Sequence, residues 1–197
     1  MSKLLYIKAN PKRDEDSNTF KISESFTEAY KKANPNDEII TLDLYKEGIK
    51  FLDEEMLKDM FSGKDTIMLK YAKEFLQVDK YVIAAPMWNL GSPAILKAYF
   101  DYVTYVGITF KYTEQGAVGL LQNKKALFIT TTGGNYTEAP MKDYEMGERY
   151  LKTILGFMGV TDFTTISSEL TNVLQGEELD KSINESIEEA KKFASRF

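Results

Sequence analysis

At 197 residues, with 28% charged and 43% hydrophobic residues, the chain has the size and composition of one globular domain with a substantial core. A formal net charge of -5 argues against nucleic acid as a partner, and without a membrane-length apolar run or a signal-peptide layout the expected location is the cytoplasm. The sequence contains no Cys and no His, which excludes disulfides, thiol nucleophiles and most zinc sites and means that an enzyme built on this chain would rely on a bound cofactor.

The predicted elements alternate between strand and helix along the chain. Predicted strands are short apolar runs, and predicted helices repeat apolar residues every three or four positions. In chain order we expect a strand at 4–7, a polar loop at 10–16, a helix at 17–32, a strand at 38–44, an irregular stretch at 48–63 with a short helix at 54–60, a helix at 65–76, a strand at 81–85, a helix at 93–106, a strand within 124–131, a helix at 143–158, an edge strand at 161–167, and a last helix with Leu179, Ile183, Ile187 and Ala190 on one face.

Five strands in this alternation predict an α/β fold in a single domain covering residues 1–197. The expected sheet is parallel, has helices on both faces and follows the strand order 2-1-3-4-5. The first, third and fourth strands are then neighbours, so the loops at their carboxyl ends converge. Ligands of open α/β sheets bind at that edge.

The loop after the third strand has the most informative composition. Pro86 cannot donate to a sheet ladder and ends the strand, and Ser92 and Pro93 are placed to cap and begin the next helix. Between them lies a predicted exposed turn that presents a sulfur, the only Trp of the chain and an amide. Its residues are Met87, Trp88, Asn89 and Leu90.

The other two loops complete a possible ligand site. Asn10 and the helix start at Ser17, Asn18 and Thr19 offer hydroxyl and amide groups beside unpaired backbone N–H groups, which suits a phosphate, although simple capping by Ser17 or Thr19 is the alternative. After the fourth strand, Thr131, Thr132, Gly133 and Gly134 would let the backbone approach a flat ligand, although a plain turn is the alternative. A phosphate joined to a planar heteroaromatic ring is found in flavin mononucleotide (FMN).

The chain resembles a known family over nearly its full length. The resemblance is to the flavodoxin-like, FMN-dependent NADH azoreductases, also described as NADH:quinone oxidoreductases. The segments that carry it are Ala-Pro-Met-Trp-Asn-Leu (85–90), Leu-Lys-Ala-Tyr-Phe-Asp (96–101), Gly-Ile-Thr-Phe-Lys-Tyr-Thr-Glu (107–114), Thr-Gly-Gly (132–134) and Leu-Gly-Phe-Met-Gly-Val-Thr-Asp (155–162).

This resemblance implies roles for the residues already singled out. Asn10 and residues 17–19 would hold the FMN phosphate, and residues 87–90 and 131–134 would line the flavin ring. Tyr112 and Phe157 would border the substrate space, and Tyr112 and Tyr136 could stack on the nicotinamide of NADH, although Tyr136 is equally well an ordinary tyrosine. Two positions depart from the family pattern: Ala9-Asn10 replaces a Ser pair, and Thr132 replaces a common Arg.

The expected activity is that of an FMN-dependent oxidoreductase. The resemblance implies that electrons pass from NADH through the bound flavin to an azo compound or a quinone in a ping-pong cycle. The backbone N–H groups of Asn89, Gly133 and Gly134 are our candidates for hydrogen bonds to the ring edge. The helix at 93–106 is apolar almost all round, which favours a homodimer that uses this helix over burial within one domain. The resemblance agrees and implies that each flavin lies near the subunit boundary.

Two functions from other classes compete with this prediction. A flavodoxin-like electron carrier would bind FMN but not turn over NADH. A cofactor-free signalling module of the same fold would need a phosphoacceptor Asp at a strand end, and the first and third strand ends offer none. The acidic run Asp14-Glu15-Asp16 lacks the Gly and distant Glu of a calcium loop, so no metal site is expected and the run is interpreted as solvated.

Overall fold

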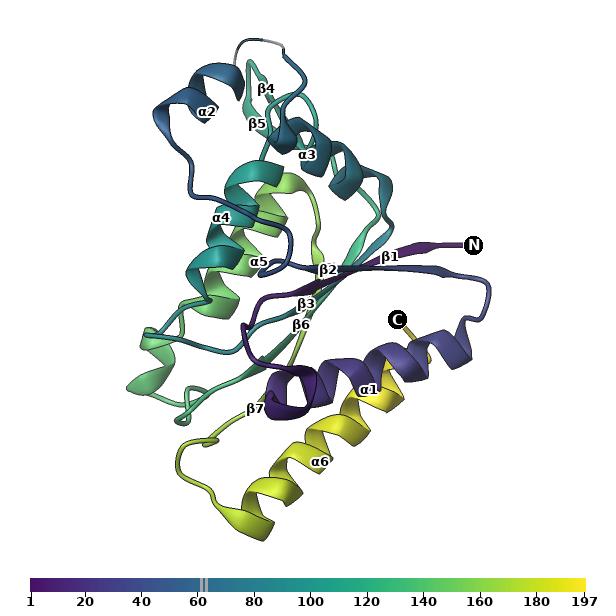
Figure 1. Ribbon diagram of the computed structural model, residues 1–197, viewed down its shortest axis with the longest axis vertical. Helices are drawn as coiled ribbons and strands as arrows, with labels where there is room; N and C mark the ends of the chain where they lie inside the picture. Colours follow the sequence, from purple (N-terminus) through teal and green to yellow (C-terminus); the bar gives the residue numbers. More distant parts are fainter. Residues whose placement is uncertain (61, 63) are drawn as a thin grey trace.

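The computed structural model describes residues 1–60, 62 and 64–197, and Figure 1 shows a central sheet with helices on both sides. Within these residues, five parallel strands form the sheet in the order β2-β1-β3-β6-β7, which confirms the predicted order. Their bounds are β1 Lys3–Lys8, β2 Glu38–Asp43, β3 Lys80–Ala84, β6 Lys125–Thr131 and β7 Asp162–Ser168.

Each strand divides its side chains between two cores. In β1, Leu5 and Ile7 face the core under helices α3, α4 and α5, whereas Leu4 and Tyr6 face the core under α1 and α6. Strands β3 and β6 alternate in the same way, as expected for a sheet covered on both faces. The helix bounds are α1 Asn18–Ala33, α2 Glu54–Met60, α3 Ile67–Gln77, α4 Ala94–Val103, α5 Gly147–Met158 and α6 Gly176–Ala194.

Two helices are shorter than predicted, for local reasons. Helix α4 ends at Val103 rather than near 106 because the buried Thr109 hydroxyl donates to the Val103 carbonyl (2.7 Å) and accepts from the Tyr105 N–H (2.9 Å). Helix α5 begins at Gly147 rather than 143 because the Glu145 carboxylate accepts from the N–H of Glu148 (2.9 Å) and so caps its first turn. A short 3-10 helix, Met141–Tyr144, includes the first two of the predicted residues that precede α5.

The structure also contains a hairpin that the pattern analysis missed. Strands β4, Phe110–Thr113, and β5, Gly116–Gly119, pair antiparallel outside the main sheet. The hairpin packs on the carboxyl end of α5, where Phe110 contacts Phe157 with ring centroids 4.8 Å apart. The strands are too short, and β5 too rich in Gly, to show a strand periodicity in the sequence.

Two further expectations concern the segment around α4. Ser92 does not cap the helix: Pro93 occupies the N-cap position, and the buried Ser92 hydroxyl has no hydrogen-bond partner among the described residues. Most apolar side chains of α4 are covered within one subunit, with Leu96, Tyr99 and Phe100 fully buried, whereas Ile95 is half-buried and Ala94 exposed. The apolar surface of this helix therefore does not by itself require a second chain.

The predicted irregular stretch at 48–63 contains helix α2 at its expected position, and positions 61 and 63 lie outside the described residues. No helix in the described part of the chain is both long enough and apolar enough to cross a membrane.

Candidate functional site

The carboxyl ends of β1, β3, β6 and β7 meet around one cavity of about 240 Å³, called the cradle below. This is the edge of the sheet at which the sequence predicts a ligand. The residues that line it are Asn10, Lys12, Asp16, Ser17, Asn18, Thr19, Pro86, Met87, Trp88, Thr131, Gly133, Thr171 and Asn172.

Helix α1 points its first turn at the cradle. Ser17 is its N-cap, and the Ser17 hydroxyl accepts from the Phe20 N–H (3.2 Å) and from the Asn10 side-chain amide (3.0 Å). The N–H groups of Asn18 and Thr19 have no intrahelical acceptor because they belong to the first turn. Capping and ligand binding are therefore compatible here: Ser17 uses one N–H group and leaves others for an anion.

A buried pair of hydroxyl groups joins this helix start to the neighbouring strand. Thr19 Oγ1 and Thr131 Oγ1 are 2.7 Å apart, and both side chains are buried. The contact connects residues 112 positions apart in the chain, so it fixes the start of α1 relative to the end of β6. Thr19 therefore positions the helix start and does not cap it.

The loop after β3 is held by the ladder to β6 beyond the end of the strand. The N–H groups of Ala85 and Met87 donate to Ile129 O (3.1 Å) and Thr131 O (2.9 Å). Pro86 lies between these two donors, at a position where the ladder to β6 needs no N–H. The proline thus ends β3 without interrupting the bonds that place Met87 against the cradle.

The next four residues form a tight two-residue hairpin turn. Trp88 and Gly91 exchange backbone hydrogen bonds of 2.8 and 3.0 Å, and the central residues Asn89 and Leu90 have φ of 48° and 71°. Positive φ at both central positions is the geometry of a type I′ turn, which favours Asn and Gly. Leu90 is therefore in a strained conformation beside the cradle.

We expect Leu90→Asn to raise the free energy of unfolding of the apoprotein by about 0.5–1 kcal/mol, because Asn tolerates the left-handed region better than Leu. Urea denaturation measures the change. Leu57→Asn on α2 is the matched control, because Leu57 has a similar exposed fraction (43% against 37%) and a helical backbone. The control is expected to be neutral or destabilising, and a Leu90→Asn protein no more stable than wild type would contradict the strain at this turn.

The glycine loop after β6 is held through its carbonyl groups, and two of its N–H groups have no acceptor among the described residues. The carbonyls of Thr132, Gly133 and Gly134 accept from the backbone of residues 170–172 (3.0–3.3 Å). The N–H groups of Gly133 and Gly134, like that of Asn89, have no acceptor among the described residues. The three N–H groups proposed for the edge of a flat ligand are thus available.

Two charged side chains lie at the cradle. Lys12 is exposed at its rim, and Asp16 forms an ion pair with Arg13 at 2.7 Å. Residues 14–16 are exposed, as the sequence predicts, but Asp14 also forms an ion pair: its carboxylate lies 2.6 Å from the ammonium of Lys8. The Lys8 ammonium pairs with Asp14 and Glu24, and the Arg13 guanidinium pairs with Glu15 and Asp16, whereas Lys12 at the rim of the cradle has no ion-pair partner among the described residues.

The other predicted contact residues divide into two groups. Asn89, Leu90, Thr132 and Gly134 belong to the loops that flank the cradle. Tyr136 lines a separate polar groove of about 450 Å³ between the glycine loop and α5, together with Thr132 and Arg149. The glycine loop thus has the cradle on one side and this groove on the other.

Tyr112 and Phe157 are not brought to the cradle within one subunit. Tyr112 is 72% exposed on the hairpin, and both rings pack on Phe110. The cradle loops contact the opposite end of α5, where Met146 N donates to Leu90 O (2.9 Å). Phe157 lies eleven residues beyond Met146, about 16 Å further along the helix axis.

The sequence analysis missed Lys12, Thr171 and Asn172. The last two follow edge strand β7, whose carboxyl end also meets the cradle. The available signal was the polar pair after β7, the fifth strand of the predicted sheet. A larger hollow of about 870 Å³ runs along α6, but its polar lining comes from that helix and the turn after it, so no second element closes it into a site.

Comparison with known proteins gives a consistent result. Residues 2–194 match the family model described as Flavodoxin-like fold. The chain is 60% identical to an FMN-dependent NADH:quinone oxidoreductase of Caldicellulosiruptor saccharolyticus and 59% identical to FMN-dependent NADH:quinone oxidoreductase 2 of Clostridium acetobutylicum, in each case over the whole of both chains.

Solved structures agree with the relatives. An azoreductase from Bacillus anthracis superposes with a TM-score of 0.92 at 37% identity and full coverage of both chains. A second protein of that organism, an FMN-dependent NADH-azoreductase in complex with FMN, superposes with a TM-score of 0.87 at 32% identity, covering 98% of this chain and all of the other.

Proposed function

This chain belongs to the flavodoxin-like family of FMN-dependent NADH:quinone oxidoreductases and azoreductases, and we propose that it binds FMN in the cradle and passes electrons from NADH to a quinone or an azo compound. The observation that carries the proposal is the convergence of four loop ends on one cavity that presents free N–H groups on two of its sides.

The residues of the cradle fit the phosphate of FMN. Unpaired N–H groups at the start of α1, the hydroxyls and amides of Asn10 and residues 17–19, and the nearby Lys12 suit a dianion. The departure from the family pattern at Asn10 is accommodated, because its amide hydrogen-bonds Ser17 and so takes part in shaping the helix start.

The other side of the cradle fits a flavin ring. Met87 and Trp88 offer soft and aromatic surface, and the free N–H groups of Asn89, Gly133 and Gly134 can donate to acceptors on the ring edge. Donors fixed in this way stabilise negative charge that develops on a ring during reduction. Leu90 would contribute apolar contact from the strained turn.

Bound FMN would accept a hydride from NADH and pass the electrons on to the acceptor. The chain's own residues then need only to bind, align and exclude water, which agrees with a sequence without His or Cys. We propose that donor and acceptor use the same space in turn, in a ping-pong cycle, with Tyr136 beside the nicotinamide.

Tyr112 and Phe157 can border the acceptor only if a second subunit contributes them. Exposed apolar side chains lie on the turn beside the cradle (Trp88 and Leu90) and on the segment that leads into α5 (Tyr144 and Met146), and the Tyr112–Phe157 surface lies at the other end of α5. We therefore propose a homodimer that pairs these two surfaces. Sedimentation velocity at micromolar concentration is expected to give a dimer mass, and a monomer would overturn the dimer proposal.

The test of function begins with the visible spectrum of the purified protein, followed by anaerobic titration with NADH. A bound yellow flavin that is bleached by NADH, and parallel initial-velocity lines when NADH and a quinone or an azo dye are varied, are the expected results. Bound flavin that NADH reduces only slowly would indicate an electron carrier instead. A protein that takes up no flavin from excess FMN would refute the proposal.

A further inference from the structure

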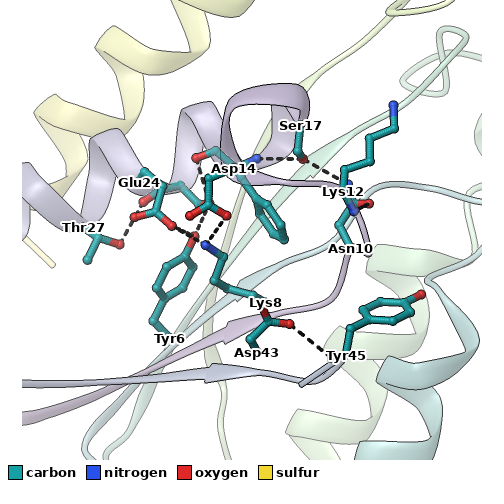
Figure 2. Close-up of polar contacts among 12 residues, drawn as sticks. Tyr6, Lys8, Asn10, Lys12, Asp14, Ser17, Glu24, Thr27, Asp43 and Tyr45 are labelled. Carbon is teal, nitrogen blue, oxygen red and sulfur yellow. Dashed lines mark hydrogen bonds and ion pairs between the residues drawn. The ribbon is translucent and has the colours of Figure 1, made fainter. Parts of the chain in front are cut away.

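Lys8, the last residue of β1, is a buried cation beneath the start of α1. The alternation of β1 turns it to the same face as Leu4 and Tyr6, and its side chain is 7% exposed. Its ammonium lies 2.6 Å from a carboxylate oxygen of Asp14 and 2.6 Å from one of Glu24 (Figure 2).

A buried ammonium is costly unless it is paired and hydrogen-bonded. Burial pushes the pKa of Lys8 down, but the hydrogen bonds to Asp14 and Glu24 outweigh it and hold that pKa above its ordinary value. The side chain is therefore charged at neutral pH, and it stabilises the conformation in which both carboxylates reach it. Its Nζ also lies 4.4 Å from the centroid of the Phe20 ring.

The two carboxylates that pair with Lys8 lie in different parts of the structure. Glu24 sits within α1, is half-buried and also accepts from the Tyr6 hydroxyl (3.1 Å), so helix α1 and strand β1 hold it in place. Asp14 sits in the short 3-10 helix Asp14–Asp16, in the loop between β1 and α1, and its side chain is 56% exposed. The pair with Asp14 therefore ties an exposed loop to a buried cation.

This loop has few other anchors. Residues 11–16 are all exposed, and the 3-10 helix buries no side chain. The Ser17 N–H, at the N-cap of α1, donates to Asp14 O at 3.4 Å, so the position of Asp14 bears directly on the helix start. Figure 2 shows Asn10, Lys12 and Ser17 beside this ion cluster.

We propose that Lys8 and Asp14 are positioning residues for the flavin phosphate: their ion pair holds the loop at residues 10–17 in the shape that aims the first N–H groups of α1 into the cradle. The inference rests on the proposed function. Neither side chain is among those that line the cradle, so both act through the loop.

The test compares Asp14→Asn with Glu15→Gln in the full-length apoprotein. Glu15 is the next residue of the same 3-10 helix, it pairs only with the exposed Arg13 (3.1 Å) among the described residues, and its replacement removes the same charge. If charge alone mattered, both variants would bind the phosphate dianion more tightly. If position matters, Asp14→Asn weakens FMN binding about tenfold or more, and Glu15→Gln does not.

Quenching of flavin fluorescence measures the Kd for FMN and, separately, for riboflavin, which has the ring but no phosphate. We expect Asp14→Asn to leave riboflavin binding within about twofold of wild type, because the ring side of the cradle is untouched. Equal weakening for both flavins would mean a general loss of structure and would overturn the inference, as would an FMN affinity equal to that of Glu15→Gln. Lys8→Met removes the other member of the ion pair, and we expect the same result: weaker FMN binding with riboflavin binding within about twofold of wild type.

The comparison also separates the two proposals. If wild type binds neither flavin, the proposed function fails. If wild type binds FMN tightly and Asp14→Asn binds it equally well, only the role of the ion pair fails.

Discussion

We expect Gly119→Ala to lower the free energy of unfolding by about 3 kcal/mol, because the added methyl group has no room. A Cβ at this position would lie 2.2 Å from the Met158 carbonyl carbon and 2.3 Å from the Gly159 nitrogen. Both are backbone atoms, so no side-chain rotation relieves the overlap.

The surrounding hydrogen bonds prevent an easy backbone shift. Gly119 pairs with Phe110 across the hairpin, and two residues later the Leu121 N–H donates to Met158 O at 2.8 Å. The hairpin must therefore separate from the end of α5 or distort it. Separation would also disturb the packing of Phe110 on Phe157.

Urea denaturation of the apoprotein measures the loss, and Gly156→Ala is the control. Gly156 lies within α5, and an added methyl group there would have no described atom within 4 Å apart from its chain neighbours and its own helix backbone. Alanine there is expected to stabilise the helix by about 0.5–1 kcal/mol. A Gly119→Ala protein as stable as wild type would show that the hairpin is not held against α5 in solution.

The contrast between these two glycines shows where prediction from sequence stops. The short apolar runs of β1, β3 and β6 and the alternation of strands with helices along the chain were sufficient for the sheet order and both layers of helices, because these features are local in the chain. The hairpin depends on a contact between Gly119 and residues 158 and 159, about forty positions away, which no local pattern reports.

The candidate site likewise has a part that local sequence predicts and a part that only the fold creates. Eight of the twelve residues predicted to bind the cofactor line the cradle, because their loops follow strands whose order was predictable: Asn10, Ser17, Asn18, Thr19, Met87, Trp88, Thr131 and Gly133. The ion pair between Lys8 and Asp14 was missed, because in the sequence a lysine at a strand end and an acidic run are each typical of solvated surface. Only the fold brings them within 2.6 Å.

Gly133→Ala is expected to weaken FMN binding by about 10–100-fold, the equivalent of a steric cost of about 1–3 kcal/mol. A Cβ at Gly133 would lie 2.4 Å from Asn172 Nδ2 and 2.9 Å from Asn172 Cγ. Asn172 lines the cradle, and its N–H donates to Gly133 O (3.3 Å), so the two residues cannot simply move apart. Displacement of the Asn172 amide or of the glycine loop would then change the shape of the cradle on the side proposed for the flavin ring.

The neighbouring glycine offers the same substitution without the overlap. A Cβ at Gly134 meets only the ring of Tyr136, at an ordinary 3.4 Å, so Gly134→Ala is expected to bind FMN within a fewfold of wild type. Adding Asn172→Ala to Gly133→Ala removes both close atoms and is expected to restore part of the lost affinity. Because the ring side is affected, riboflavin binding weakens together with FMN binding, in contrast to Asp14→Asn. Equal affinities for the two alanine variants would mean that the glycine loop does not border the flavin.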